Sequence, residues 1–131
     1  MAPANLNNAK SQIIDGKDNI VIVNHLDGIR GGRTLNVDGF TPEVIHAGHV
    51  IVKLASGDYA PMPLTSGGDA YAALPSGAAY AGYLVASIPT KQPLAAIMVR
   101  GTINPKASPF ALTSILEDVK AALPLIDYQE E

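Results

Sequence analysis

Three histidines are the side chains of this sequence best suited to chemistry, and His46 and His49 lie only three residues apart. A metal site on one strand needs two histidines that point the same way, whereas residues i and i+3 of a strand point to opposite faces. Residues 54–55, where a ligand carboxylate would be sought, read Leu-Ala. Both rings could share a metal only if a turn at residues 47–48 brought them together. We expect His46 and His49 to lie in surface loops without a metal, and His25 stands alone.

A glycine-rich segment at residues 28–33, with the sequence GIRGGR, is the nearest approach to a phosphate-binding loop. It lacks the Gly-x4-Gly-Lys-Ser/Thr pattern, and no predicted helix follows it to offer an N-terminus to an anion. The glycines are therefore typical of a turned connection.

The candidate nucleophiles and acidic residues also lack the surroundings that catalysis needs. Neither Ser66 nor Ser76 stands in a Gly-x-Ser-x-Gly turn, and Glu117 and Asp118 fall on the solvent side of a predicted helix. Residues 125–128 (LIDY) have the wrong spacing for the tyrosine-bearing loop of trimeric dUTPases. We therefore expect that the protein is not an enzyme and has no catalytic, cofactor-binding or metal-binding residue.

The composition points to contacts with other chains. The 131 residues fit one domain and include no cysteine. Charged residues make up 16% of the chain, against about 25% in an ordinary soluble domain. So few charges on a small surface predict oligomerisation or docking on a partner.

The nine basic residues are scattered, unlike a nucleic-acid-binding surface. The longest apolar stretch, residues 78–86, is too short to span a bilayer.

The hydrophobic pattern predicts a mainly β chain. Residues 1–17 are polar without a period, so we expect a flexible arm there, followed by a single β-rich domain at 18–131. Residues 20–23 (IVIV) are β-branched throughout and predict a short buried strand. Further strands are predicted at 33–37, 49–54, 59–63 (with two prolines, hence edge or irregular), 79–88, 94–100 and 125–128.

One helix is predicted near the C-terminus. Five apolar residues recur with helical spacing and form one stripe: Leu112, Ile115, Leu116, Val119 and Leu123. Ser108 can cap the start, with Pro109 at the first helical position, and Pro124 ends the helix. The fold class is therefore α+β: mainly β with one C-terminal helix.

Three stretches, in this order, resemble the head decoration proteins of tailed phages, of the lambda type. They are residues 31–37 (GGRTLNV) followed by 45–51 (IHAGHVI), residues 80–85 (YAGYLV) followed by 95–104 (AAIMVRGTIN), and the closing helix at 112–123 with residues 125–126. The chain is also similar to head fibre proteins of phages and prophages of Bacteroidales. The longer N-terminal part, including residues 20–23, departs from the shorter lambda-type pattern.

The resemblance implies a compact decoration-protein-like β domain with an extended N-terminal arm, and a structural role in the virion. Such proteins form a homotrimer on the outer surface of the expanded head and brace the major capsid protein. From the composition and motifs we expect no nucleic acid, membrane or cofactor as a partner.

Two other functions stay open. A head-fibre base or carbohydrate-binding surface module would stack sugars on exposed aromatic residues, for which Tyr59, Tyr71, Tyr80 and Tyr83 are available. A small metal-dependent enzyme comes third and depends on the His46–His49 turn.

Overall fold

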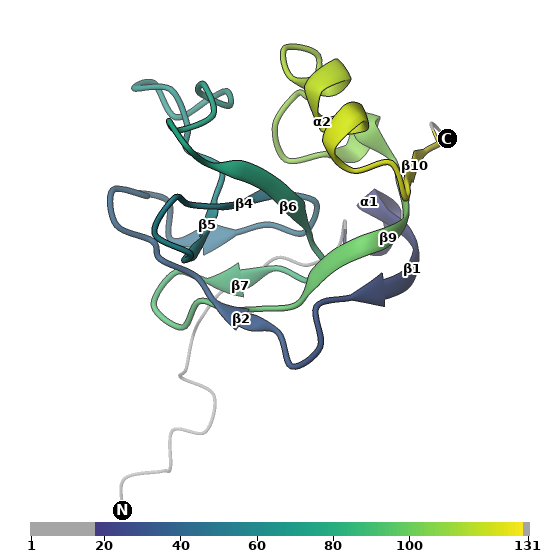
Figure 1. Cartoon of the computed structure of the whole chain (residues 1–131), viewed down its shortest axis with the longest axis horizontal. Coiled ribbons are helices and arrows are strands. Elements are labelled where there is room, and N and C mark those ends of the chain that lie inside the picture. The colour runs from purple at the N-terminus through teal and green to yellow at the C-terminus, as the bar shows by residue number, and fades with distance from the viewer. Residues whose placement is uncertain (1–17, 130–131) are drawn as a thin grey trace, which may run out of the picture.

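A computed structural model describes residues 18–129 of the chain, and the predicted arm at 1–17 and residues 130–131 lie outside the described residues. The described part is mainly β with one longer helix near its C-terminal end, which confirms the predicted α+β class. Figure 1 shows the elements in chain order. The helical elements are α1 (Asp18–Val21), the 3-10 turn η1 (Pro105–Ala107) and α2 (Leu116–Ala122).

One six-stranded sheet organises the molecule. Its order is β1-β9-β6-β4-β5, and β10 also pairs with β9. The bounds are β1 (Ile22–Gly28), β9 (Ile97–Ile103), β6 (Ala79–Leu84), β4 (Val50–Lys53), β5 (Tyr59–Pro61) and β10 (Ile126–Tyr128). Two short pairs complete the fold: β2 (Arg33–Thr34) with β8 (Leu94–Ala95), and β3 (Val44–Ile45) with β7 (Ile88–Pro89).

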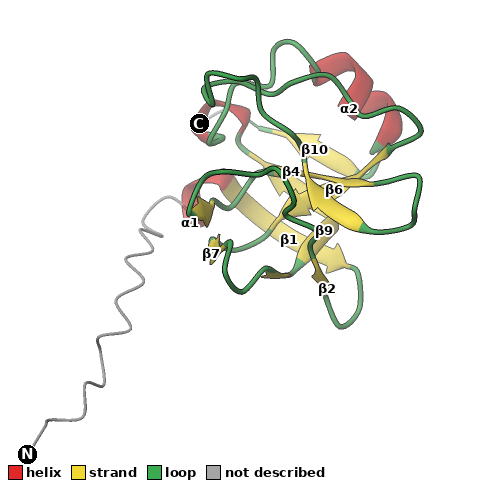
Figure 2. Cartoon of the chain, turned by 90° about the vertical axis from the view of Figure 1, so that its left-hand side faces the viewer, coloured by secondary structure: helices red, strands yellow, loops and turns green. Residues whose placement is uncertain are grey.

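The sheet is covered on both faces, because successive side chains of a strand alternate between them. On β4, Val50 and Val52 pack into one core cluster with Val119 of α2, whereas Ile51 packs into a second cluster with Ile45 of β3. The same alternation recurs on β6 and β9. Figure 2 shows α2 above the sheet, with β2 and β7 below it.

The predicted strand at residues 20–23 is wrong at its start. Ile20 and Val21 belong to α1, and of the four residues only Val21 is buried; Ile20 is 53% exposed. Tertiary contacts explain the departure from β propensity. The carbonyl of Val21 accepts a hydrogen bond from the Asn104 amide, and the Asp18 carboxylate is held by Ser87.

The predicted helix is right in position and wrong in its start. Ser108 ends η1 instead of capping α2, and α2 begins only at Leu116. The apolar stripe is nevertheless buried: Leu112, Ile115, Val119 and Leu123 are core residues, and Leu116 is partly buried. Leu112 and Ile115 are buried although they lie in an irregular segment before α2. Their helical spacing in the sequence therefore did not require a helix at these positions.

Two long predicted strands are divided. Residues 79–88 form β6 up to Leu84 and then leave the sheet for β7, and residues 94–100 divide into β8 and β9. The predicted end of the second strand at residue 100 is wrong, since β9 continues through Gly101 to Ile103. A Cβ on Gly101 would meet the carbonyl of Asn24 on β1 and lie 2.6 Å from Sδ of Met98. Glycine therefore allows the close approach of β1 there.

Candidate functional site

The three histidines do not come together. His25 lies exposed on β1 and His46 is exposed in the turn before β4, but His49 is 1% exposed. The expected surface location is therefore wrong for His49. Within residues 18–129 no group of three His, Asp or Glu side chains is placed to hold a metal ion.

His49 is part of a buried aromatic cluster. Its ring meets those of Phe40, Tyr71 and Phe110 edge-on, with centroids 5.2–5.7 Å apart. Its Nε2 donates a hydrogen bond to the carbonyl of Met62, at 3.0 Å. Burial is the main cause that lowers the pKa of His49 to about 4, and the charge of His46 adds to it, whereas the hydrogen bond to Met62 opposes it. A neutral, fully packed imidazole of this kind is a structural residue.

The tyrosines do not form a row of exposed rings. Tyr71 and Tyr83 are buried, and burial raises the pKa of both. Tyr71 accepts a hydrogen bond from the Val50 amide, and the hydroxyls of Tyr83 and Tyr128 are 2.8 Å apart. These side chains hold the sheet together and are closed to a sugar.

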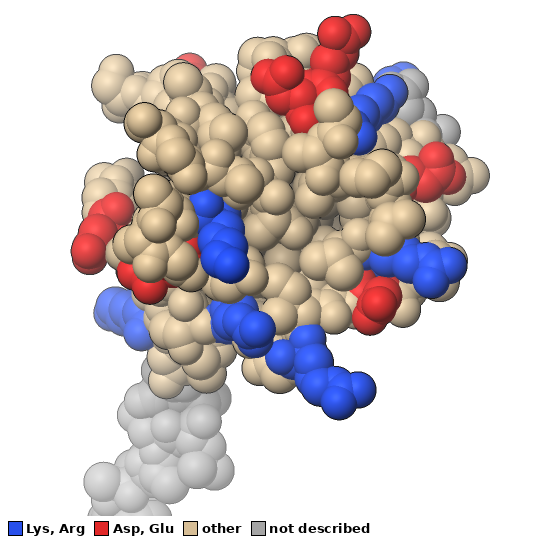
Figure 3. Space-filling model, in the orientation of Figure 1, with Lys and Arg blue, Asp and Glu red and all other residues tan. Residues whose placement is uncertain are grey.

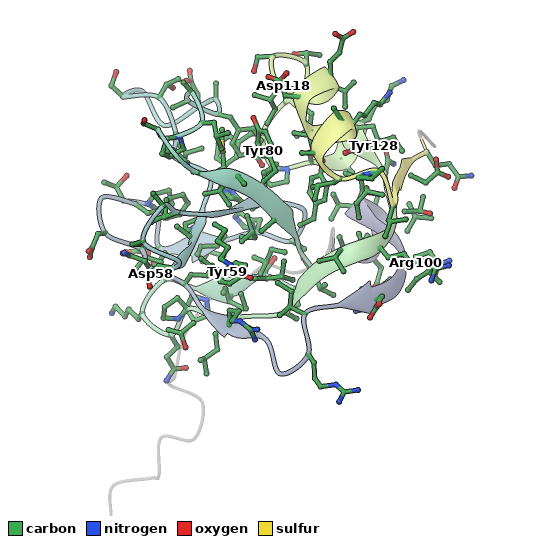
Figure 4. All side chains as sticks on the ribbon, in the orientation of Figure 1. Asp58, Tyr59, Tyr80, Arg100, Asp118 and Tyr128 are labelled. Carbon is green, nitrogen blue, oxygen red and sulfur yellow. The ribbon has the colours of Figure 1, made fainter. Side chains whose placement is uncertain are left out.

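Tyr59 and Tyr80 are only partly buried (Figure 4). The Tyr59 ring lies 5.6 Å from the Arg33 guanidinium and 5.7 Å from the Lys53 ammonium. Tyr80 on β6 faces Asp118 on α2 across a shallow groove (Figure 4). Burial, and secondly the charge of Asp118, raises the pKa of Tyr80.

The glycine-rich segment 28–33 is a turned connection between β1 and β2, as predicted. Gly31 and Gly32 have positive φ of 80° and 69°. Arg33 Nη1 donates to the carbonyls of Gly32 and Arg30, at 2.6 and 3.2 Å. This guanidinium is therefore engaged within its own turn. Ser66 and Ser76 lie exposed in loops, and Glu117 and Asp118 are exposed on α2.

Two features of the surface remain as candidate sites. The first is an open cavity of about 480 Å³ between residues 36–42 and residues 63–68, which we call the loop cavity. Sequence reasoning treated both loops only as connections. The turn residues Asp38-Gly39 and Gly67-Gly68 were visible, but nothing in their spacing brought the two loops together.

The second feature is the free side of β1 together with the adjoining end of α1. We call it the β1 edge and define it by Ile20 of α1 and by Val23 and Leu26 of β1. Within the described part of the chain β1 is the end strand of the sheet and pairs only with β9. Ile20, Val23 and Leu26 are 53%, 38% and 59% exposed. Two β-bulges explain the exposure of Val23 and Leu26, because these are the extra residues of β1 in the register with β9.

Figure 3 shows an uncharged area near the centre of one face, with charged side chains of both signs around it. Uncharged surface of this extent is available for contact with other molecules.

Comparison of the chain with models of protein families, with curated proteins and with solved structures finds no match. Neither helix in the part of the chain that the structure describes is long and apolar enough to cross a membrane.

Proposed function

We propose that this protein is a structural component of a tailed-phage virion that coats the outer surface of the expanded head as a homotrimer. In this role it binds copies of itself and the major capsid protein, and it catalyses no reaction. The proposal extends the resemblance of residues 31–128 to head decoration proteins.

The β1 edge is the observation that best supports the proposal. An edge strand presents unpaired main-chain N–H and C=O groups, to which another chain can add a strand. Ile20, Val23 and Leu26 supply apolar surface beside these groups, and burying such surface contributes about 25 cal/mol per Å². Soluble domains commonly protect an edge with lysine, proline or β-bulges. β1 (IVNHLDG) contains neither lysine nor proline, and its two bulges leave Val23 and Leu26 exposed.

Decoration needs no catalytic site. A protein that binds the expanded shell and not its precursor stabilises the expanded form by the difference in affinity. The low fraction of charged residues (16%) and the uncharged area on one face suit a protein that is partly covered by other chains.

The experiment is to measure the mass of the protein in solution and its binding to heads. Light scattering at micromolar concentration should give about three chain masses, and the protein should sediment with expanded heads but not with precursor heads. Leu26→Lys should dissociate the trimer, because it places a charge in the proposed interface. Leu94→Lys is the matched control, since Leu94 is 68% exposed on β8, which pairs with β2 and not with β1.

Failure to bind expanded heads would overturn the proposal. A wild-type monomer, or a Leu26→Lys variant that stays trimeric, would remove the β1 edge as its support.

A further inference from the structure

The loop cavity is large enough for a small ligand. Its volume of about 480 Å³ lies within the range of about 300–1,000 Å³ that is usual for ligand pockets. Its walls come from two segments that are far apart in the chain, residues 36–42 and 63–68, and strand β5 contributes Ala60 and Pro61. Both loops lie on the left-hand side of Figure 1.

Both walls are held by their own hydrogen bonds. In the first loop, the amide of Asp38 donates to Oδ1 of Asn36 at 3.1 Å, and the amide of Phe40 donates to the carbonyl of Val37 at 2.9 Å. The Phe40 ring is anchored against His49 at 5.3 Å. This loop is therefore shaped before any ligand arrives, which reduces the entropic cost of binding.

The second loop is closed as a small hairpin. The amide of Thr65 donates to the carbonyl of Ala70 at 2.9 Å, and the amide of Gly68 donates to the carbonyl of Thr65 at 2.8 Å. Oγ1 of Thr65 also donates to Oδ1 of Asp69 at 3.3 Å. The second wall is thus fixed independently of the first.

The polar groups of the cavity select the charge of a ligand. Of the described residues that line it, Asp38 is the one with a charged side chain. Asp38 is exposed to solvent at the cavity. A carboxylate there disfavours phosphates and carboxylic acids, and a single carboxylate is too few ligands for a divalent cation. Within the described chain, the Asp38 carboxylate and the hydroxyls of Thr41 and Ser66 have no hydrogen-bond partner.

The remaining walls are apolar and rigid. Phe40, Pro42, Pro61, Pro63, Leu64 and Pro75 line the cavity between the polar groups. These walls disfavour an anion. They suit a ligand whose hydroxyls meet the polar groups at the rim and whose C–H surfaces lie against the prolines and Phe40. A pyranose ring has this combination.

We propose that the loop cavity is a binding site for a neutral mono- or disaccharide. Asp38 accepts hydrogen bonds from neighbouring hydroxyls of the sugar, Thr41 and Ser66 contact its rim, and the prolines cover a face of the ring. This inference goes beyond head decoration and does not depend on it, since it uses no residue of the β1 edge.

The test is to titrate ¹⁵N-labelled full-length protein with sugars and to measure the changes in its amide chemical shifts by NMR. The probes are the methyl glycosides of glucose, galactose, mannose and N-acetylglucosamine, with methyl glucuronoside as the charged counterpart of glucose. At least one neutral glycoside should cause saturable shifts in the millimolar range that are confined to residues 36–42 and 60–68. The glucuronoside should bind several-fold more weakly than the glucoside.

Two variants address the site without disturbing the core. Gly67→Leu should block binding by filling the cavity, because Gly67 does not require positive φ and a Cβ there has its nearest neighbour at 3.4 Å. Asp38→Ala should weaken the neutral glycosides about tenfold or more and remove the discrimination against glucuronoside. Glu117→Ala, on the exposed side of α2, is the control and should bind as the wild type does.

Shifts in both loops that persist in Gly67→Leu, shifts located elsewhere, or no saturable shift with any neutral glycoside would each overturn the proposal. A thermal melt of each variant identifies any loss of fold. If the protein binds no sugar but still binds expanded heads, the saccharide-site proposal is wrong and the proposed decoration function stands.

Discussion

The carboxylate of Asp18 holds Ser87, which lies 69 positions further along the chain, by two hydrogen bonds. Oδ2 of Asp18 accepts from the Ser87 amide at 3.0 Å, and Oδ1 accepts from the Ser87 hydroxyl at 2.8 Å. The same hydroxyl accepts from the Ala47 amide at 3.0 Å. One partly buried carboxylate therefore ties α1 to the turn between β6 and β7 and to the turn before β4.

Asp18→Ala should destabilise the protein by about 1–3 kcal/mol, because it leaves the Ser87 donors without their partner. Urea denaturation monitored by circular dichroism would measure this change. Glu43→Ala is the control: Glu43 is exposed, and its loss should change the free energy of unfolding by no more than about 0.5 kcal/mol. Equal midpoints for the two variants would show that the Asp18–Ser87 contact contributes nothing to stability.

Acid should destabilise the fold through His49. Its pKa is lowered by burial to about 4 in the folded protein, from an ordinary 6.5. The unfolded chain therefore binds a proton more tightly, so stability is complete above pH 6.5 and falls as the pH drops from there towards 4. Relative to His49→Gln, which does not titrate, wild-type protein should lose about 3 kcal/mol between pH 7 and pH 4.

The readout for His49 is the difference between urea midpoints of wild type and variant across this pH range. Subtracting the variant removes the contribution of the carboxylates that the two proteins share. A difference between wild type and His49→Gln that stays constant with pH would contradict a buried, neutral imidazole.

Leu112→Ala should cost about 2–5 kcal/mol as a truncation in the core, although Leu112 precedes α2. Leu112 is 3% exposed and packs in the same cluster as Val119. Leu125→Ala removes the same atoms from a side chain that is 62% exposed and should cost within about 0.5 kcal/mol. Similar melting temperatures for the two variants would mean that the irregular segment 109–115 does not close the core.

Deleting residues 1–17 should leave the fold and the trimer intact and weaken binding to expanded heads. These residues include only Leu6, Ile13 and Ile14 as sizeable apolar groups, too few to offset an ordering cost of about 1–2 kcal/mol per residue. Strand addition to the shell needs main-chain groups rather than particular side chains. Co-sedimentation with expanded heads measures the effect, and undiminished decoration by the truncated protein would remove the arm from the docking mechanism.

The sequence identified several strands well, because runs of apolar residues there fill the core on both faces of the sheet. The stretch at 49–54 became β4, whose residues Val50, Ile51 and Val52 are all buried, and residues 126–128 form β10. The N-terminal element was harder. Residues 20–23 have strong β propensity, yet half of them form α1, since the hydrogen bonds of Asp18 and Val21 come from residues more than 60 positions away.

The candidate sites could not be predicted from the sequence, because they too depend on contacts between segments that are far apart in the chain. The loop cavity exists because two turns meet in space, and no local pattern records that meeting. The exposure of Val23 and Leu26 depends on bulges in the register with β9, and an apolar residue in a strand is ordinarily assigned to the core. His49 was assigned to the surface because no pattern marks a histidine that is enclosed by three aromatic rings.

The position of β9 has a consequence for how the chain folds. β1 and β9 are paired from Ile22↔Ile103 to Gly28↔Met98, and β10 adds to the far side of β9 through Ile126↔Gly101. During synthesis β1 cannot pair until the ribosome has made β9, about 70 residues later in the chain. Pairings so distant in sequence give a high contact order, which slows folding to the millisecond-to-second range. The sheet therefore closes late, as the C-terminal strands leave the ribosome, and β1 is exposed to other chains throughout that interval.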